Sequence, residues 1–554
     1  MELLVPVGDF DKLSVAIENG ADAVYLGVMQ FNARLKAENF SFEKLNECVG
    51  IAHSAGVKVY VTLNTLIKNS EIDDFFKTVG KIYESNADAI ILQEISLAKI
   101  IKTNFPDMKI HASTQARLQN LENLKYIDRV ILPRELSKKE IKDISKHGID
   151  LEIFVQGALC FSVSGLCLMS SLIGQRSGNR GICAQPCRKK YNGRYLMSMK
   201  DLSLIGKLDS IEKIGVKSIK IEGRLRSERY LRLVTQIYRK SLDGEKITKK
   251  DLEILNSSFT RELTTGFFSD SADKTGKHNV YFEKIRGEIY SYVNNKKPIN
   301  IKRKKIIPNV PEIKNLEDSK KIGFHVKLYN IKDIELANKS DYVENVFYYI
   351  DNEDVLEARK ISNKKFYVYL PTLINDSDIE KYIAKVREIN PDGVLINSQN
   401  VSQHFSDYDV IHDYGLNVFN DYDLKYYGKS IISPELSFKD LSCFKNKNFL
   451  TLVHGNLNVM TTKNPLPKKL KYDERFTFPV VQEKDYFRVL NSRQIGLLDK
   501  ILLLKDAGIT QYYFDLSSRA GKWLDIYTRI INGEKLNFKK IGKGLTFGHF
   551  DKGV

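Results

Sequence analysis

The sequence has few cysteines and no long hydrophobic run, and each shortage excludes a class of protein. Six cysteines in 554 residues are too few for a disulfide framework. No run of about 18 apolar residues occurs, so no transmembrane helix is expected. The chain opens on MELLVPVG, an apolar segment without a basic leader, so we expect no secretory signal and a cytoplasmic location.

Histidine is also scarce, and this bears on hydrolytic chemistry. The chain has nine histidines, with neither an HExxH nor a GxSxG motif. A peptidase needs a nucleophile with a base, or a metal-activated water. The serines Ser162, Ser164, Ser170 and Ser171 have no obvious histidine partner in the sequence. The residue pattern therefore argues against proteolysis.

Acidic residues are outnumbered by basic ones, 69 to 86, which gives a formal net charge of +17. Basic residues are densest at Lys296, Lys297, Lys302, Arg303, Lys304 and Lys305. An excess of this size favours a polyanionic partner such as RNA, through phosphate contacts and counterion release. The alternative is a lysine-rich composition with no nucleic-acid partner, and charge alone leaves both open.

The first 240 residues alternate short β-branched runs with amphipathic helical patterns. The expected strands are 2–7, 23–27, 57–64, 89–92, 109–113, 129–133, 151–156 and 218–223. Strands that alternate with helices form parallel sheets with right-handed crossovers. Eight of them over this length predict an α/β fold of the TIM type, a (β/α)8-like barrel.

The second half of the chain repeats the first in order. VYVTLNTLI (59–67) matches FYVYLPTLI (366–374), ILPRELS (131–137) matches ISPELS (432–437), and FVQGAL (154–159) matches LVHGNL (452–457). IYRKSLDGEK (237–246) and LTTGFF (263–268) match IYTRIINGEK (526–535) and LTFGHF (545–550). We therefore expect a barrel at 1–245, a small β extension and basic linker at 246–320, and a second, degenerate barrel at 321–554.

Four of the six cysteines, Cys160, Cys167, Cys183 and Cys187, follow the seventh expected strand within 28 residues. The carboxyl ends of barrel strands carry the chemistry of TIM-type folds. Four thiolates complete either a tetrahedral zinc site or a [4Fe–4S] cluster. The six-residue first gap is unlike the short knuckles of zinc ribbons, so the spacing favours iron–sulfur without excluding zinc. The second repeat lacks these cysteines.

Several phrases resemble the U32 group, long labelled collagenase-like peptidases. They are LVPVGDFDKLSVAIENGADAVYLG, FNARLKAENFSFEKL, EIFVQGALCFSVSGLC, GNRGICAQPCRKKY and IKIEGRLRS, and the likeness continues through FTRELTTGFF. The four cysteines fall at the positions where this group holds its cluster. The long form with a second, cysteine-free barrel resembles the branch that includes the ribosomal-RNA hydroxylase.

The resemblance implies an activity, cofactors and a partner. Relatives include hydroxylases that act on C5 of a pyrimidine in transfer or ribosomal RNA and depend on iron–sulfur assembly and prephenate. Others hydroxylate a quinone ring without molecular oxygen. We therefore expect a [4Fe–4S] cluster, prephenate as a co-substrate, and an RNA substrate, with ribosomal RNA favoured. The alternatives are a collagenase-like peptidase and a non-catalytic RNA- or ribosome-binding protein with a structural cluster.

Polar residues at the expected strand ends are the candidates for the site. As catalytic groups we expect His111, Glu135, Lys220 and Glu222. As substrate-binding groups we expect Tyr25, Asn32, Arg34, Asn64, Gln115, Arg134, Gln156 and Arg224. The arginines suit carboxylates or phosphates, which guanidinium binds bidentately. The alternative for each is a structural pair, such as Glu222 with an arginine or with Lys220.

The second barrel keeps some polar residues at matching positions. Glu435 answers to Glu135, His454 to Gln156, and Asp515 falls near the place of Glu222. The second barrel is therefore expected to be a docking or structural partner, with a retained pocket as the alternative.

Overall fold

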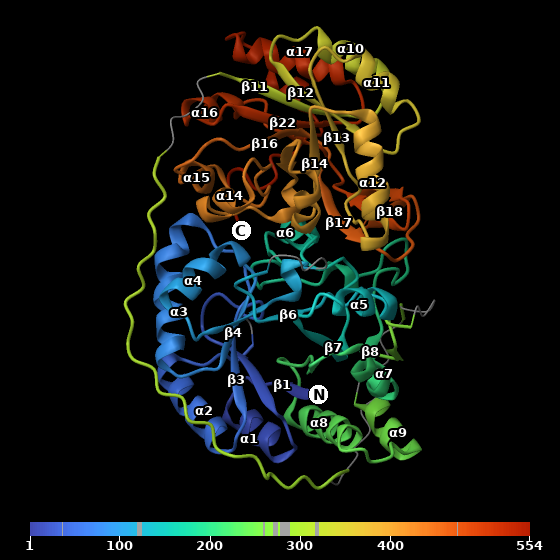
Figure 1. Cartoon of the computed structure of the whole chain (residues 1–554). Coiled ribbons are helices and arrows are strands. Elements are labelled where there is room, and N and C mark those ends of the chain that lie inside the picture. The colour runs from blue at the N-terminus through green and yellow to red at the C-terminus, as the bar shows by residue number, and fades with distance from the viewer. Residues whose placement is uncertain are drawn as a thin grey trace. The chain divides into compact units, whose positions relative to one another are not determined.

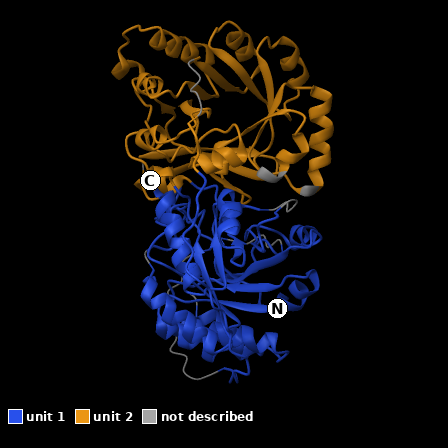
Figure 2. Cartoon of the chain, turned by 60° about the vertical axis from the view of Figure 1, so that its left-hand side comes forward, with its two compact units in different colours: residues 1–67, 71–167, 177–311 blue, residues 68–70, 168–176, 312–554 orange. Residues whose placement is uncertain are grey.

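The computed structural model describes residues 1–35, 37–118, 124–258, 261–269, 275–276, 289–315, 321–473 and 475–554. Within them the chain forms two compact units, drawn in blue and orange in Figure 2. Unit 1 comprises residues 1–67, 71–167 and 177–311, and unit 2 comprises residues 68–70, 168–176 and 312–554. No helix in this described part is long and apolar enough to cross a membrane.

Eight parallel strands close into a barrel in unit 1 (Figure 1). They are β1 (Glu2–Pro6), β2 (Ala23–Gly27), β3 (Lys58–Leu63), β4 (Ala89–Leu92), β5 (Lys109–Ala112), β6 (Arg129–Ile131), β7 (Asp150–Ala158) and β9 (Ser218–Ile221). Strand β9 pairs with β1, where Glu2 lies opposite Ser218, and also with β7, so the sheet closes on itself. The TIM-type prediction is confirmed, and each expected strand is present to within a few residues.

Helices alternate with these strands. They include α1 (Phe10–Glu18), α2 (Phe42–Ser54), α3 (Ile72–Glu84), α4 (Ala98–Asn104), α5 (Lys138–Ser145), α7 (Leu208–Ile214) and α8 (Glu228–Leu242). Ser41, Ser137 and Ser227 accept backbone N–H bonds in the first turns of α2, α5 and α8. Such caps satisfy N–H groups that a helix leaves unpaired. They fix where the loops at the carboxyl ends of the strands stop.

The barrel interior is filled rather than open, as the fold requires. Leu4, Tyr60, Ile91 and Ile131 are buried in one hydrophobic cluster. A charged layer lies beside it: Glu152 Oε1 is 2.9 Å from Lys220 Nζ, and Glu152 Oε2 is 3.4 Å from Arg129 Nη1. Arg129 also pairs with Glu2 at 2.5 Å. Each buried charge therefore has a partner, which is the condition for its burial.

Residues 246–320 were expected to form a small β extension and a basic linker. The structure describes helix α9 (Lys249–Ser257), the short strand β10 (Leu263–Thr264) and an extended segment, and the rest lies outside the described residues. Strand β10 pairs with β8 (Asp201–Ser203), which runs antiparallel to β7.

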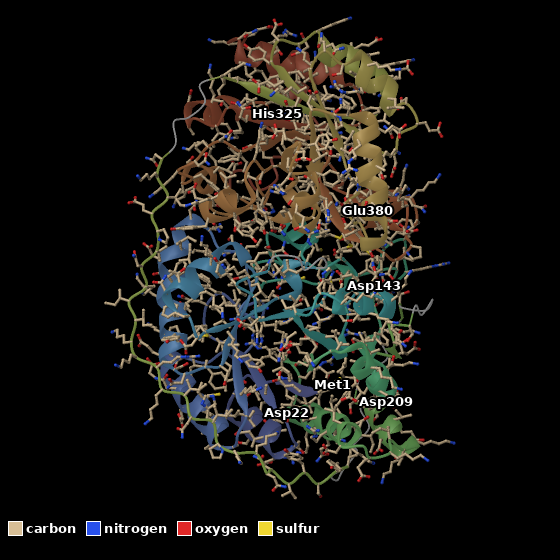
Figure 3. All side chains as sticks on the ribbon, in the orientation of Figure 1. Met1, Asp22, Asp143, Asp209, His325 and Glu380 are labelled. Carbon is tan, nitrogen blue, oxygen red and sulfur yellow. The ribbon has the colours of Figure 1, made fainter. Side chains whose placement is uncertain are left out.

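The extended segment, residues 289–311, is here named the basic strap, and it runs along the helices of unit 1 (Figure 1). Lys296 Nζ lies 3.1 Å from Asp22 Oδ1, and Asp22 is labelled in Figure 3. Arg303 Nε donates to Asp107 Oδ2 at 2.7 Å, and its guanidinium lies 4.7 Å from the centre of the Tyr83 ring. Lys296 and Arg303 thus attach the strap to unit 1. Four other lysines of the strap are exposed: Lys297, Lys302, Lys304 and Lys305.

Unit 2 contains a second barrel, as predicted. Its strands are β11 (Gly323–Leu328), β12 (Val343–Tyr349), β13 (Lys365–Tyr369), β14 (Gly393–Ile396), β15 (Asp409–His412), β16 (Thr451–Gly455) and β22 (Gln511–Leu516). They pair in parallel, and single bridges from His412 to Ser430 and from Ile431 to Leu450 link β15 to β16. The barrel is degenerate because its sixth strand is reduced to residues 430–431. His325 on β11, labelled in Figure 3, is fully buried, and its Nε2 lies 2.7 Å from Gln511 Oε1.

The two barrels share contacts as well as strand order. In unit 1 the Tyr238 hydroxyl donates to Gln156 Oε1 at 2.8 Å, and in unit 2 the Tyr527 hydroxyl lies 3.3 Å from His454 Nδ1. In unit 1 the short strand β8 runs antiparallel to β7. In unit 2 the short strand β21 (Ile495–Gly496) runs antiparallel to β16 in the same way. The sequence repeat is therefore a structural repeat.

The units differ in the segment after the seventh strand. Unit 1 has the cysteine loops there. Unit 2 has an antiparallel sheet of β17 (Asn458–Thr462), β18 (Lys469–Tyr472), β19 (Phe476–Glu483) and β20 (Tyr486–Leu490), in the order β17-β20-β19-β18. This sheet was not predicted from the sequence.

Candidate active site

The candidate site lies at the carboxyl ends of the strands of the first barrel. Lys220 on β9 and Tyr25 on β2 meet there: Lys220 Nζ lies 4.3 Å from the centre of the Tyr25 ring and 2.9 Å from Glu152 Oε1. Burial lowers the pKa of Lys220, although the Glu152 carboxylate opposes that shift. The Tyr25 hydroxyl donates to the Ile221 carbonyl at 3.0 Å, and burial raises its pKa. The site thus holds a buried ammonium against an aromatic face.

Arginines surround Glu222 at this end of the barrel. Arg34 Nη2 lies 3.5 Å from Glu222 Oε1, and the Ala158 N–H donates to Glu222 Oε2 at 3.3 Å. Arg134 lies 3.7 Å over the Phe154 ring and donates to the Ala158 carbonyl. Burial raises the pKa of Glu222, but the guanidinium groups, Arg34 first, outweigh it and hold that pKa below its ordinary value. Glu222 is therefore an ionised partner of arginines, and Lys220 pairs with Glu152 instead.

The third predicted arginine, Arg224, is buried and orders the loop after β2. Its Nη1 donates to Asn32 Oδ1 at 3.2 Å, and Nη2 donates to Asn39 Oδ1. Asn32 in turn donates to the Val28 carbonyl at 2.6 Å, and Asn64 Oδ1 accepts the Ala33 N–H at 2.9 Å. Burial lowers the pKa of Arg224 to about 10. These predicted binding residues hold the loop that carries Arg34.

His111 lies inside the barrel, 3% exposed, with its ring 4.6 Å from that of Tyr60 in an edge-to-face contact. Burial, together with Arg129 and Lys220, holds its pKa well below the ordinary value. The imidazole is therefore neutral at pH 7. Among the described residues its Nδ1 has no hydrogen-bond partner.

The remaining predicted residues connect the site to its supporting loops. Glu135 accepts the Ser164 N–H at 2.8 Å and the Ser164 hydroxyl at 3.1 Å, so it ties down the first cysteine loop. Gln156 is fully buried on β7, in the hydrogen bond to Tyr238 described above. Gln115 is half-buried in the turn after β5, where its N–H donates to Ser113 Oγ at 3.3 Å.

The four cysteines lie in two loops between β7 and β8, and none of the four is joined in a disulfide. Cys160 and Cys183 are exposed, and Cys167 and Cys187 are half-buried. Burial raises the pKa of Cys187 to about 12, with Cys160 and Cys183 adding to the shift. Cys160, Cys183 and Cys187 are therefore electrostatic neighbours at one end of the barrel.

The fit of these cysteines to a metal cluster can be judged from their chemistry. In the described part of the chain, no three His, Cys, Asp or Glu side chains lie in a geometry that would hold a metal ion. The donor set is nevertheless the one a [4Fe–4S] cluster uses, four cysteine thiols on loops rich in glycine and serine. A thiol binds metal only as a thiolate, so binding and deprotonation would occur together.

Sequence reasoning missed Arg188, which directly follows Cys187. Its Nη2 donates to the Leu159 carbonyl at 3.1 Å and its Nη1 to Ser198 Oγ at 3.2 Å, so one side chain crosslinks both cysteine loops. Burial lowers its pKa. Its position next to a cysteine was the available signal, because a cation there offsets thiolate charge.

Gly157 lets β7 approach Glu222 closely. Its φ is +113°, and a Cβ there would lie 2.8 Å from both Glu222 Cβ and the Glu222 carbonyl oxygen. Gly157→Ala is expected to destabilise unit 1 by about 1–3 kcal/mol more than Gly148→Ala and to lower activity by moving Glu222. Gly148 is the matched control, since its φ is +74° but nothing lies within 4 Å of its Cβ position. Equal denaturation midpoints for the two variants would contradict the close approach.

The sequence of this chain has relatives among known proteins. The profile of peptidase family U32 matches residues 8–278. "tRNA hydroxylation protein P1" of Bacillus subtilis is 34% identical over 325 residues, covering 53% of this chain and 76% of the relative. An "Uncharacterized protease" of Methanocaldococcus jannaschii is 32% identical, covering 62% and 94%. "23S rRNA 5-hydroxycytidine C2501 synthase" of Escherichia coli is 34% identical, covering 53% of this chain and 47% of the relative.

Proposed function

Because this chain belongs to peptidase family U32, we propose that it is an RNA-modifying enzyme that hydroxylates C5 of a pyrimidine. The observation that carries the proposal is the first barrel's carboxyl end, where Cys160, Cys183 and Cys187 are electrostatic neighbours and Arg134 acts on both Cys160 and Glu222. Relatives named for hydroxylation of transfer RNA and of 23S ribosomal RNA support the choice of reaction.

The chain's own residues bind and orient the substrate. Phe154 is half-buried and offers aromatic surface to a splayed-out base, as sequence-specific RNA recognition uses, whereas Tyr25 is buried in the hydrophobic cluster against which Phe154 packs. Arg34 is 43% exposed at its side chain, so its guanidinium is available to a phosphate or a carboxylate. Lys220 is a buried positioning residue, because it contacts the Tyr25 ring and pairs with Glu152. Glu135 is a positioning residue, because it acts through the cysteine loop that it holds.

The reaction sets what else must be bound. Replacing C5–H by C5–OH is a two-electron oxidation of the ring. It needs either an oxygen-atom donor that takes up both electrons, or water as the oxygen source with an external acceptor for two electrons and two protons. We propose that Cys160, Cys167, Cys183 and Cys187 hold a [4Fe–4S] cluster, which supplies one-electron redox chemistry when bound. Prephenate is the proposed co-substrate, and its two carboxylates suit Arg34 and Arg134.

The basic strap is proposed to contact the RNA backbone. Replacing Lys302, Lys304 and Lys305 together by glutamine is expected to weaken RNA binding at low salt. It should also reduce the slope of log K against log salt by about 2–3, because three phosphate contacts are lost. Binding isotherms over a salt series measure both quantities. Lys246→Gln, Lys249→Gln and Lys250→Gln make the same charge change elsewhere, so an equal effect from both triples would refute a specific role for the strap.

Proteolysis is the other activity that relatives' names suggest, and the serines near the cysteines bear on it. The hydroxyls of Ser162 and Ser171 donate to backbone carbonyls, and that of Ser164 donates to Glu135. A serine nucleophile needs a base positioned to take its proton, and Glu135 is occupied in holding the loop. These contacts argue against Ser162, Ser164 or Ser171 acting as a nucleophile.

Nucleoside mass spectrometry on separated RNA fractions tests the proposal. A strain lacking the chain is expected to lose a pyrimidine nucleoside heavier than its parent by one oxygen atom. The long two-barrel form leads us to propose the large-subunit ribosomal RNA fraction. Loss from the transfer RNA fraction instead would reassign the substrate, and no loss from either would refute the function.

A further inference from the structure

The part of the chain that carries the four cysteines has charge of one sign only. From Ile153 to Lys200 the sequence contains seven basic residues and no acidic one. At the chain's overall frequency of 69 acidic residues in 554, about six would be expected in a segment of this length. A positive segment at the carboxyl end of the barrel favours an anionic partner there.

Half of these cations are already occupied within the protein. Arg188 donates to both cysteine loops, Arg180 Nη2 lies 2.5 Å from Glu71 Oε1, and Lys200 Nζ lies 2.8 Å from Glu262 Oε2. Three others are exposed and have no acidic partner among the described residues: Lys189, Lys190 and Arg194. Their charge is therefore available to a ligand.

These three exposed cations lie on a two-residue hairpin, which we name the basic turn (residues 189–195). The Tyr191 N–H donates to the Arg194 carbonyl at 2.8 Å, and the Arg194 N–H donates to the Tyr191 carbonyl at 2.9 Å. The two central residues, Asn192 and Gly193, have φ values of +49° and +74°. Positive φ at both central positions is what a type I′ turn requires, and Asn-Gly is its preferred sequence. The basic turn thus presents its cations on a defined backbone.

The basic turn is attached to the polypeptide around Cys187. Tyr191 is fully buried, and its hydroxyl donates to the carbonyl of Pro186, the residue before Cys187, at 3.2 Å. Lys189 follows Cys187 by two residues. A ligand held by the basic turn is therefore held beside the cysteine loops.

The side chains around the basic turn suit a nucleic-acid backbone better than a membrane surface. Over residues 184–200, all of which the structure describes, no large apolar side chain is exposed. A segment that binds a membrane surface inserts apolar side chains as well as cations. Lys190 Nζ lies 5.5 Å from the centre of the half-buried Tyr195 ring, and cations beside aromatic rings are typical of sites for single-stranded nucleic acid.

We propose that the basic turn binds the phosphate backbone of the RNA strand whose target base enters the first barrel. The choice of RNA as the polyanion rests on the proposed function, whereas the charge, the turn and its attachment to Pro186 are independent of it. Phosphate contacts position a nucleic acid without reading its sequence. The basic turn accordingly contributes affinity and placement at the site, and base recognition is left to the barrel.

Fluorescence anisotropy of a labelled oligouridine, measured on the full chain over a salt series, tests the proposal. Glutamine at all three cations of the basic turn is expected to weaken binding at low salt at least tenfold. It should also reduce the slope of log K against log salt by about 2, because three phosphate contacts to a single strand are lost. A matched control makes the same charge change at three other exposed lysines of unit 1: Lys207, Lys213 and Lys217.

A second pair of variants tests the turn itself without changing its charge. Gly193→Val places a β-branched side chain at a φ of +74°, where nothing lies within 4 Å of the Cβ position, so the strain falls on the turn alone. It is expected to weaken oligouridine binding several-fold. Gly215→Val imposes similar strain at a φ of +96° after α7, also without a neighbour within 4 Å, and should bind as the unsubstituted chain does.

Three results would overturn the proposal. The first is a salt slope that the basic-turn triple lowers no more than the control triple does, and the second is equal binding by Gly193→Val and Gly215→Val. The third is tighter binding to phosphatidylserine vesicles than to oligouridine through the same three cations, which would make a membrane the partner. Denaturation midpoints identify a variant that has lost its fold.

Oligouridine binding is read without any hydroxylation, so the two proposals fail separately. If the RNA mass measurement fails while the three cations still set the salt slope, the proposed function is refuted and the basic turn remains a phosphate-binding element. If the nucleoside is lost in the deletion strain but the basic-turn triple binds normally, the function holds and the basic turn is refuted.

Discussion

Cys187→Ser is expected to abolish iron binding and RNA hydroxylation while the chain stays folded. Cys187 is half-buried beside Cys160 and Cys183, and a hydroxyl does not replace a thiolate as a ligand to iron. Iron and sulfide content of anaerobically purified protein, its visible absorption and the modified nucleoside in complemented cells are the measurements.

Cys443→Ser is the matched control, because Cys443 is exposed in unit 2, apart from the four predicted ligands. It is expected to keep full iron content and activity. A Cys187→Ser protein with unchanged iron would contradict the assignment of the cluster. Zinc in place of iron in the unsubstituted protein would contradict the choice of metal.

Glu152→Ala is expected to give the largest loss of stability, about 3–5 kcal/mol, because it leaves buried cations without their partner. Glu152 is fully buried and lies 2.9 Å from Lys220 and 3.4 Å from Arg129. The denaturation midpoint of unit 1 is the measurement. Asp74→Ala removes an exposed carboxylate of the Asp74–Lys77 pair and is expected to cost less than about 1 kcal/mol.

Lys220→Met tests whether the Lys220–Glu152 pair contributes to activity as well as to stability. It leaves Glu152 with Arg129, so its cost in stability should be smaller than that of Glu152→Ala. It also removes the ammonium over the Tyr25 ring, so the loss of activity should be larger than the loss of folded protein explains. A Lys220→Met enzyme with full activity would remove Lys220 from the proposed positioning residues.

The barrel of unit 1 could be predicted because its strands are short β-branched runs separated by helices of regular length. The second barrel could be predicted from the repeat, since FYVYLPTLI lies on and just after β13, as VYVTLNTLI does on β3. The sheet of β17 to β20 could not be found in this way, because residues 458–490 have no counterpart in the first repeat. Nor could the repeat show that strand six shrinks to residues 430–431.

The sequence predicts which strand ends carry the charged residues better than it predicts which of them form ion pairs. The sequence offered an arginine or Lys220 as the partner of Glu222. That the partner is Arg34, and that Lys220 pairs with Glu152 instead, depends on which residues of distant strands face inward at the same height. Neither pair is local in sequence. His111 was located at its strand, but its low pKa comes from burial and from Arg129 and Lys220, which only the closed barrel brings together.

The masses of RNA nucleosides in a deletion strain test the central claim most directly. The claim predicts that one pyrimidine nucleoside carrying an extra oxygen atom disappears, that the full chain restores it, and that the chain with all four cysteines, Cys160, Cys167, Cys183 and Cys187, replaced by serine does not. An unchanged nucleoside profile in the deletion strain, or restoration by the four-serine chain, would contradict it.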